Sequence, residues 1–200
     1  MGYGLYPEGM GEKGAEKLNI SIMQSDYHIG TGYITTPLIL TQLCKYGYID
    51  TAYKLIQQEE YPSWNYMIEE TSALTESWFT LKEEEEGKKR IVGSLNHVAL
   101  GAVGQWFYTD VLGIKRDENY PAYKHFYLEP KIGGSLTYAE GSYDSVYGKI
   151  ESSWEIIGEE ITFRFVIPAN TTATVTLPDD RYQGVEFGSG EYELQISLTN

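Results

Sequence analysis

The side chains best placed to do chemistry in this sequence are carboxylates. Candidates include Glu69, Glu70, Glu76 and the acidic run at 83–86. Glu76 differs from the others because it lies beside the aromatic pair Trp78–Phe79 rather than in a charge cluster. Next to aromatic surface a carboxyl group keeps its proton more readily, and it can then act as a general acid or base. Judged from its neighbours alone, Glu76 has helix capping or a plain surface position as the alternative.

Neither a metal site nor a catalytic triad built on serine and histidine has support in the sequence. The three histidines are scattered at positions 28, 97 and 125, and Cys44 is the single cysteine. The patterns GxSxG, HExxH, GxGxxG and the phosphate-binding P-loop are absent from the 200 residues. The sequence therefore predicts carboxylate chemistry, with no metal site and no cofactor.

Composition excludes several classes of partner. Lys and Arg number 15 against 29 Asp and Glu, which gives 15 − 29 = −14 and argues against a nucleic-acid surface. No run approaches the ~20 apolar residues of a membrane span. Eighteen Tyr, four Trp and six Phe make 14% aromatic residues, which leaves carbohydrate binding open. The single cysteine favours the cytosol over an oxidising compartment.

The elements that must position these residues change character along the chain. Residues 8–110 show helical periodicity and turn signals, and short helices joined in this way pack as helical hairpins. The charge run 82–90 predicts an exposed loop. The expected helices are Glu12–Tyr27, Pro37–Lys45, Thr51–Glu59 and one from Ser94 or Asn96 to about Val111, with Leu95, Ala99, Val103 and Trp106 facing inward.

From about Tyr120 the pattern is that of short strands in a small antiparallel sandwich. We place the domain boundary after the polar segment Lys115–Asn119, predicted as a linker, so that the domains are 1–119 and 120–200. The expected strands are Lys124–Glu129, Leu136–Tyr143, Lys149–Ile157, Ile161–Ile167, Thr172–Leu177 and Glu191–Leu198, with a short one at Val185–Phe187.

Seven segments resemble the C-terminal part of bacterial α-L-rhamnosidases, in the same order and over nearly the whole chain. They are TGYITTP (31–37), YGYIDTAYKLIQQEEYPSWNYMIEE (46–70), SALTESW (72–78), SLNHVALGAVGQWFY (94–108), YKHFYLEP (123–130), SYDSVYGKIESSWE (142–155) and PANTTATVTLP (168–178). The resemblance implies an α and β protein of two domains, in which helical hairpins close an (α/α)6 barrel and a β-sandwich follows.

The resemblance also implies a mechanism with inversion at the sugar's anomeric carbon. Such enzymes use two carboxylic acids, one to protonate the leaving oxygen and one to deprotonate a water. The family's base lies in the pattern that matches Ser72–Trp78, which assigns the role of general base to Glu76. A histidine of the family that contacts the rhamnose ring corresponds to His97 in the Asn96–His97 pair.

The match has two departures near the base. Thr75 stands where the family usually has Trp, and Phe79 where it often has Asp. Trp78 is expected as an apolar wall behind Glu76, and Trp64 either lines a sugar subsite or packs inside the barrel. Two other tryptophans follow regular patterns and are expected in the core, namely Trp106 and Trp154.

The leading interpretation is the C-terminal portion of an enzyme that releases terminal α-L-rhamnose from a glycoside or polysaccharide. The family's general acid belongs to the first half of the barrel, so this chain alone is expected to be inactive. Its partner would be that missing half, or a second copy through an exposed helical face. The alternative is a non-catalytic module, carbohydrate-binding or structural, from a truncated rhamnosidase.

Overall fold

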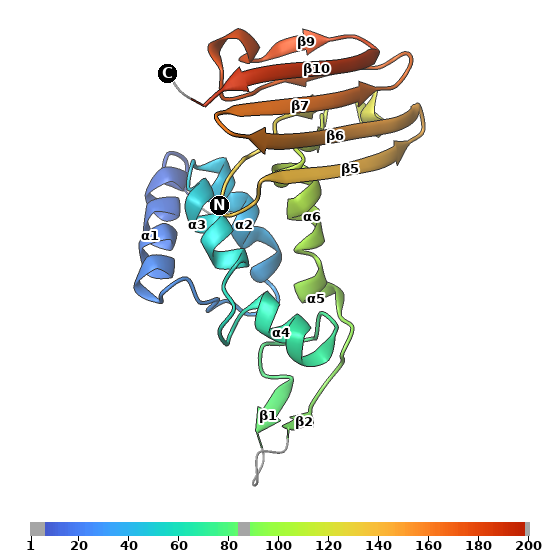
Figure 1. The fold of residues 1–200 in the computed structure, drawn as a ribbon. Helices are drawn as coiled ribbons and strands as arrows, with labels where there is room; N and C mark the ends of the chain where they lie inside the picture. The colour runs from blue at the N-terminus through green and yellow to red at the C-terminus, as the bar shows by residue number, and fades with distance from the viewer. Residues whose placement is uncertain (1–6, 84–88, 199–200) are drawn as a thin grey trace. The chain divides into compact units, whose positions relative to one another are not determined.

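The protein forms two compact units, Met1–Trp106 and Phe107–Asn200, in a computed structural model that describes residues 7–83 and 89–198 (Figure 1). The first unit is helical and carries a small hairpin, and the second consists of two four-stranded sheets.

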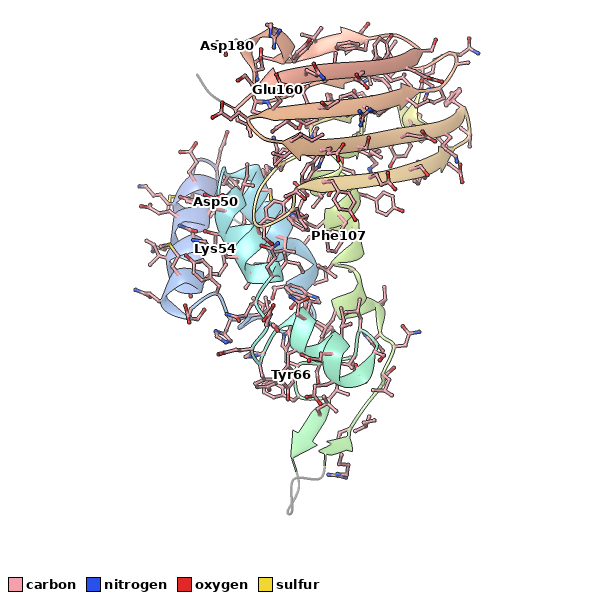
Figure 2. The ribbon with its side chains drawn as sticks, viewed as in Figure 1. Asp50, Lys54, Tyr66, Phe107, Glu160 and Asp180 are labelled. Carbon is pink, nitrogen blue, oxygen red and sulfur yellow. The ribbon has the colours of Figure 1, made fainter. Side chains whose placement is uncertain are left out.

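Three predicted helices of the first unit are confirmed with small shifts of their ends. They are α1 (Gly11–Gln24), α2 (Thr36–Lys45) and α3 (Ile49–Ile56). The chain turns between α2 and α3 at Gly47, whose φ of 85° favours glycine. Each of these helices buries an apolar face and exposes the opposite face. On α3 the exposed side chains include Asp50 and Lys54 (Figure 2). None of the described helices is long and apolar enough to cross a membrane.

The helix expected from 94 or 96 to 111 is broken. It begins only at Val98, as α5 (Val98–Gly101), and continues as α6 (Gly104–Trp106) and a π-helix (Phe107–Val111) that belongs to the second unit. Between α5 and α6 the amides of Val103 and Gln105 bond three residues back, which tightens the backbone. Of the predicted inward stripe, Val103 and Trp106 are buried, Ala99 is half-buried and Leu95 is exposed.

One helix and one hairpin were not expected. Helix α4 (Trp64–Thr71) begins at Ser63, whose hydroxyl accepts the amide of Tyr66 at 3.1 Å, a standard N-cap. Strands β1 (Leu81–Glu83) and β2 (Lys89–Ile91) pair antiparallel. The ends of the predicted loop 82–90 are therefore strands, and its centre, residues 84–88, lies outside the described residues.

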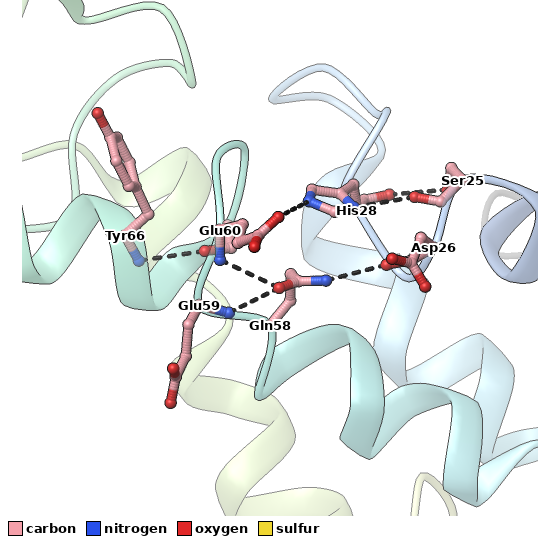
Figure 3. A network of polar contacts seen from close by, with 8 residues as sticks. Ser25, Asp26, His28, Gln58, Glu59, Glu60 and Tyr66 are labelled. Carbon is pink, nitrogen blue, oxygen red and sulfur yellow. Dashed lines mark hydrogen bonds and ion pairs between the residues drawn. The ribbon is translucent and has the colours of Figure 1, made fainter.

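A polar network ties the loop after α1 to the loop after α3 (Figure 3). The Gln58 side chain donates to the carbonyl of Asp26 at 2.9 Å, and its oxygen accepts the amides of Glu59 and Glu60. His28 bonds the carbonyl of Ser25 at 2.9 Å and approaches the Glu60 carboxylate at 3.9 Å. Gln58 therefore bonds the two loops to each other, while the hydrogen bond of His28, the first of the scattered histidines, lies within its own loop.

The second unit contains two sheets whose buried faces form its core. Along β7, buried and less buried residues alternate, as the period of two predicts. Phe126, Phe163 and Trp154 are among the fully buried side chains, each of which stabilises the fold by about 1.5–3 kcal/mol. One sheet has the order β10 (Gly190–Ser197), β7 (Glu160–Ile167), β6 (Gly148–Ile157), β5 (Tyr138–Ser145), and the other β3 (Ile114–Arg116), β4 (His125–Leu128), β8 (Thr172–Val175), β9 (Val185–Phe187).

Two details of this unit correct the sequence analysis. Strands β4 and β8 pair in parallel, with His125 opposite Thr172, whereas every strand was expected to be antiparallel. The predicted linker 115–119 begins inside β3, which pairs with β4. Two short 3₁₀-helices complete the unit, at Pro121–Tyr123 and Asp180–Tyr182.

Candidate active site

The loop that carries Glu76 begins where α4 ends. Ser72 adopts the left-handed conformation with φ of 55° and caps the helix through its amide. Thr75 is only 1% exposed, and its hydroxyl donates to the carbonyl of Ser77 at 2.9 Å. The residue that replaces the family's usual Trp is therefore a packed anchor of the loop. Phe79, at the other departure, is 66% exposed.

This loop runs alongside the segment that leads into α5. The amide of His97 donates to the carbonyl of Leu74 at 2.9 Å, and the amide of Glu76 donates to the carbonyl of Ser94 at 3.0 Å. Further along, the amide of Val92 donates to the carbonyl of Thr80 at 2.7 Å. These bonds bring the neighbourhoods of Glu76 and His97, 21 positions apart in the sequence, into adjacent backbone segments.

The Glu76 carboxylate is held at one of its two oxygens. Oε2 accepts the backbone amide of Ser94 at 3.0 Å. Within residues 7–83 and 89–198, no side chain or amide bonds Oε1, and the residue is exposed. One oxygen of this exposed residue is thus fixed while the other forms no hydrogen bond among the described residues, an arrangement that suits a base acting on water.

His97 has its ring orientation set by the helix that follows. It is the N-cap of α5, and Nδ1 accepts the amide of Ala99 at 3.1 Å. Because an amide can only donate, Nδ1 is the unprotonated nitrogen and the proton of the neutral ring lies on Nε2. The ring of Tyr33 meets the imidazole edge-on, with 6.5 Å between centroids. His97 therefore offers one oriented N–H donor.

The two tryptophans proposed near the sugar lie in packed surroundings. Trp64 is 2% exposed and Trp78 is 9% exposed, and their rings meet edge to face at 5.2 Å. The indole of Trp64 donates to the carbonyl of Leu100 at 3.2 Å, and that of Trp78 to Thr31 at 2.8 Å. Of the tryptophans expected in the core, Trp106 and Trp154 are both buried.

The residues that position Glu76 were not among those predicted from the sequence. Ser94 and Gly93 are 18 and 17 positions away in the chain, and only backbone atoms of theirs approach the carboxylate. A backbone group that binds a side chain leaves no signal in the residue type. The Gly93–Ser94 pair before a helix was only a weak indication of this contact. Among the described residues, no group of three His, Cys, Asp or Glu is arranged to hold a metal ion.

Comparisons with known families match both units. Residues 1–111 match the bacterial α-L-rhamnosidase six-hairpin glycosidase domain, and residues 113–191 match the bacterial α-L-rhamnosidase C-terminal domain. An α-L-rhamnosidase of Formosa agariphila is 34% identical over 93% of this chain, and one of Streptomyces avermitilis is 30% identical over 94%. The chain spans only 20% and 18% of those two proteins.

Solved structures agree with these matches. The S. avermitilis α-L-rhamnosidase complexed with L-rhamnose superposes with a TM-score of 0.85 at 27% identity, over 96% of this chain and 20% of its own. The Aspergillus terreus α-L-rhamnosidase gives a TM-score of 0.85 at 30% identity, over 95% of this chain and 22% of its own. With helical hairpins followed by paired β-sheets, and with family matches over both, the chain belongs to the bacterial α-L-rhamnosidase family.

Proposed function

We propose that this chain is the C-terminal portion of a glycoside hydrolase that releases terminal α-L-rhamnose with inversion, and that Glu76 is its general base. The observation that carries the proposal is the exposed Glu76 carboxylate itself, fixed through Oε2 by the amide of Ser94, with no hydrogen bond at Oε1 among the described residues. It lies in the segment that matches the family's base motif.

In this mechanism Glu76 acts on water and never on the sugar directly. Oε1 accepts a proton from a water placed beneath the anomeric carbon, while an acid elsewhere protonates the departing oxygen. The bond from the Ser94 amide to Oε2 limits the rotation of the carboxylate. A base that is already oriented loses little freedom as the transition state forms.

His97 is proposed to bind the sugar ring. Its Nε2–H is oriented by the bond between Nδ1 and the Ala99 amide, so it can donate to one ring hydroxyl. Trp78 and Trp64 are proposed to form the apolar wall behind Glu76, since both rings are buried and meet edge to face. Neither indole N–H is free for the sugar, because each donates to a backbone carbonyl.

The remaining part of the barrel is the proposed partner. The relatives are about five times longer than this chain, because it spans only 18–20% of them. Near the site, Phe79 and Val98 are 66% and 79% exposed, and apolar side chains of this size favour a covering surface. We propose that this surface is the barrel half that carries the general acid, and that the chain alone has no activity on an aryl α-L-rhamnoside.

The test is a chimaera in which residues 1–200 replace the matching fifth of the S. avermitilis enzyme. Glu76→Gln keeps the side-chain shape and the bond to Ser94 but removes the basic oxygen. It should lower kcat on an activated aryl rhamnoside by about 10²–10⁴-fold with KM little changed. Glu69→Gln, an exposed neighbour on α4, is the matched control and should keep full activity.

Proton NMR of the first-formed rhamnose in the same assay reports the anomer and so tests inversion. An active chimaera whose Glu76→Gln variant retains near-normal kcat would exclude Glu76 as the base. If that loss appeared in Glu69→Gln instead, Glu69 would take the role. Turnover by the 200-residue chain alone would contradict the proposed need for the other barrel half.

A further inference from the structure

A hollow of about 530 Å³ lies at one edge of the second unit, away from Glu76 and His97 in the sequence. Because β4 and β8 run parallel, both strands start at the same edge, and His125 lies opposite Thr172 there. The chain leading into each strand therefore reaches this edge, as does the turn between β9 and β10. Its walls include Tyr120, His125, Asn170, Thr172, Glu186 and Ser189.

One wall is rigid. His125 bonds the Asp117 carboxylate through Nδ1 and the Thr174 hydroxyl through Nε2, both at 3.0 Å. Asp117 also accepts the amide of Asn119 at 2.8 Å and the Tyr127 hydroxyl at 3.2 Å. The Asn119 amide contributes most to keeping the pKa of Asp117 below its usual value. With both nitrogens occupied, the His125 ring offers the hollow a fixed carbon surface.

Tyr120 adds a second ring beside this wall. Its centroid lies 5.6 Å from that of His125, with the planes tilted by 54°, and the residue is 52% exposed. An exposed ring held against a fixed neighbour has lost part of its freedom before any ligand arrives. It therefore offers an apolar face at low entropic cost.

Polar side chains on the other walls are available for a ligand. Over the described residues, the side chains of Asn170, Thr172, Glu186 and Ser189 form no hydrogen bond or ion pair, and neither does the phenol of Tyr120. Together they provide donors and acceptors around a ring face. A pyranose has the complementary surface, with hydroxyl groups at its rim and C–H groups on its faces.

The charge of the hollow favours a neutral ligand. Lys124, its one cationic wall residue, has its ammonium engaged by the carbonyl of Asn170 and by the ring of Tyr147 at 5.3 Å. The Glu186 carboxylate remains unpaired among the described residues. An anionic ligand would face this carboxylate and the chain's net charge of −14.

We infer that the Tyr120–Ser189 hollow binds a neutral pyranose unit of a glycan, separately from the site around Glu76. Tyr120 stacks on one face of the ring, and Asn170, Thr172 and Ser189 exchange hydrogen bonds with its hydroxyls. Glu186 accepts from a hydroxyl and disfavours sugar acids. The inference does not depend on the chain's being catalytic.

The experiment is a ¹⁵N-NMR titration of the 200-residue chain with methyl α-L-rhamnopyranoside, methyl β-D-glucopyranoside and D-glucuronate. At least one neutral glycoside should shift the amides of Asn170, Thr172 and Ser189 saturably, with Kd on the order of 1 mM. D-glucuronate should bind at least about tenfold more weakly, and Glu186→Gln should remove that difference. Shifts around Ser94 and Ala99 would report the proposed active site independently.

Tyr120→Ala should weaken the neutral glycoside by about tenfold while leaving any shifts around Ser94 unchanged. Tyr138→Ala removes a similarly exposed tyrosine from β5 outside the hollow, and it should bind within about twofold of the parent. The inference fails if neither neutral glycoside shifts these amides. It also fails if Tyr120→Ala binds as the parent does, if Tyr138→Ala loses as much, or if D-glucuronate binds as well as the neutral sugars. Should Tyr120→Ala lose its dispersed spectrum, Tyr120→Leu gives the same comparison with the bulk retained.

Discussion

A Cβ atom at position 93 would lie 3.1 Å from Oε2 of Glu76, so the Gly93 backbone and the Glu76 carboxylate lie in close contact. Gly93 also has φ of 94°, a conformation that other residues rarely adopt. The next residue, Ser94, donates its amide to the same oxygen at 3.0 Å. The backbone at 93–94 therefore forms a close-fitting seat for the proposed base.

Gly93→Ala should disturb this seat. The added methyl group must displace the carboxylate or the backbone, and the positive φ adds strain of about 1–3 kcal/mol. We expect a lower Tm for the chain. In the chimaera, we expect a lower kcat with KM little changed. Gly104→Ala is the control, because a Cβ at position 104 meets nothing within 4 Å and alanine favours helix. Equal Tm values for the two variants would contradict the close fit.

His97 combines two roles that substitutions can separate. His97→Ala removes both the N-cap of α5 and the proposed sugar donor, and should cost about 1 kcal/mol of unfolding free energy. His97→Asn replaces the cap acceptor and should restore that stability. In the chimaera, both variants should raise KM for the rhamnoside because both lack the Nε2–H donor. Normal binding by His97→Asn would show that the imidazole serves only as a cap.

Ser152 secures the end of the π-helix segment in the second unit. Its buried hydroxyl donates to the carbonyl of Leu112 at 2.6 Å. Ser152→Ala leaves that carbonyl without this donor and should reduce the unfolding free energy by about 1–3 kcal/mol in urea denaturation. Ser153→Ala, at the next position on the opposite face of β6, should change it by less than about 0.5 kcal/mol. Similar losses for both variants would exclude the hydrogen bond as the cause.

Asp110 should make stability depend on pH. Burial raises its pKa above the ordinary 3.8, although the Thr109 hydroxyl, Lys115 and Lys131 partly oppose this. The folded state therefore binds its proton more tightly than the unfolded chain, and stability falls as pH rises from about 3.8 through the raised pKa. Asp110→Asn should be more stable than the parent at pH 7, and this advantage should vanish towards pH 3.

Denaturant titrations between pH 3 and 7 measure this difference. Asp144→Asn, exposed on β5, removes the same charge without burial and is the control. A constant difference between Asp110→Asn and the parent across that range would rule out titration of Asp110 as the cause.

The sequence predicted those elements whose own residues show a clear hydrophobic pattern, and it failed for elements that depend on their partners. Strand β6 alternates between Trp154, facing the core, and Glu155, facing outward, so the period of two located it without further information. Strand β3 was missed because three residues ending in Lys115 and Arg116 show no alternation. The parallel pairing of β4 and β8 is a choice of partner, which periodicity within one strand does not encode.

For the candidate site, the sequence supplied candidate residues but not the geometry around them. The resemblance assigned roles to Glu76 and His97, and local chemistry alone had left Glu76 with ordinary alternatives. Nothing in the sequence indicated that Ser94 would supply an amide to Glu76, since any residue except proline has one. The break after α5 was not predicted, because the inward stripe is compatible with one continuous helix, although Gly101 and Gly104 are unfavourable inside a helix.

If His97 both caps α5 and binds the sugar as proposed, this double role limits how sugar preference could diversify. A side chain at this position must begin α5 by accepting the Ala99 amide, which leaves mainly Asn, Asp, Ser and Thr as replacements that preserve the helix. None of these reaches as far as an imidazole. Evolution towards another sugar would therefore proceed more readily by altering Tyr33, whose ring meets His97 edge-on, than by altering the histidine itself.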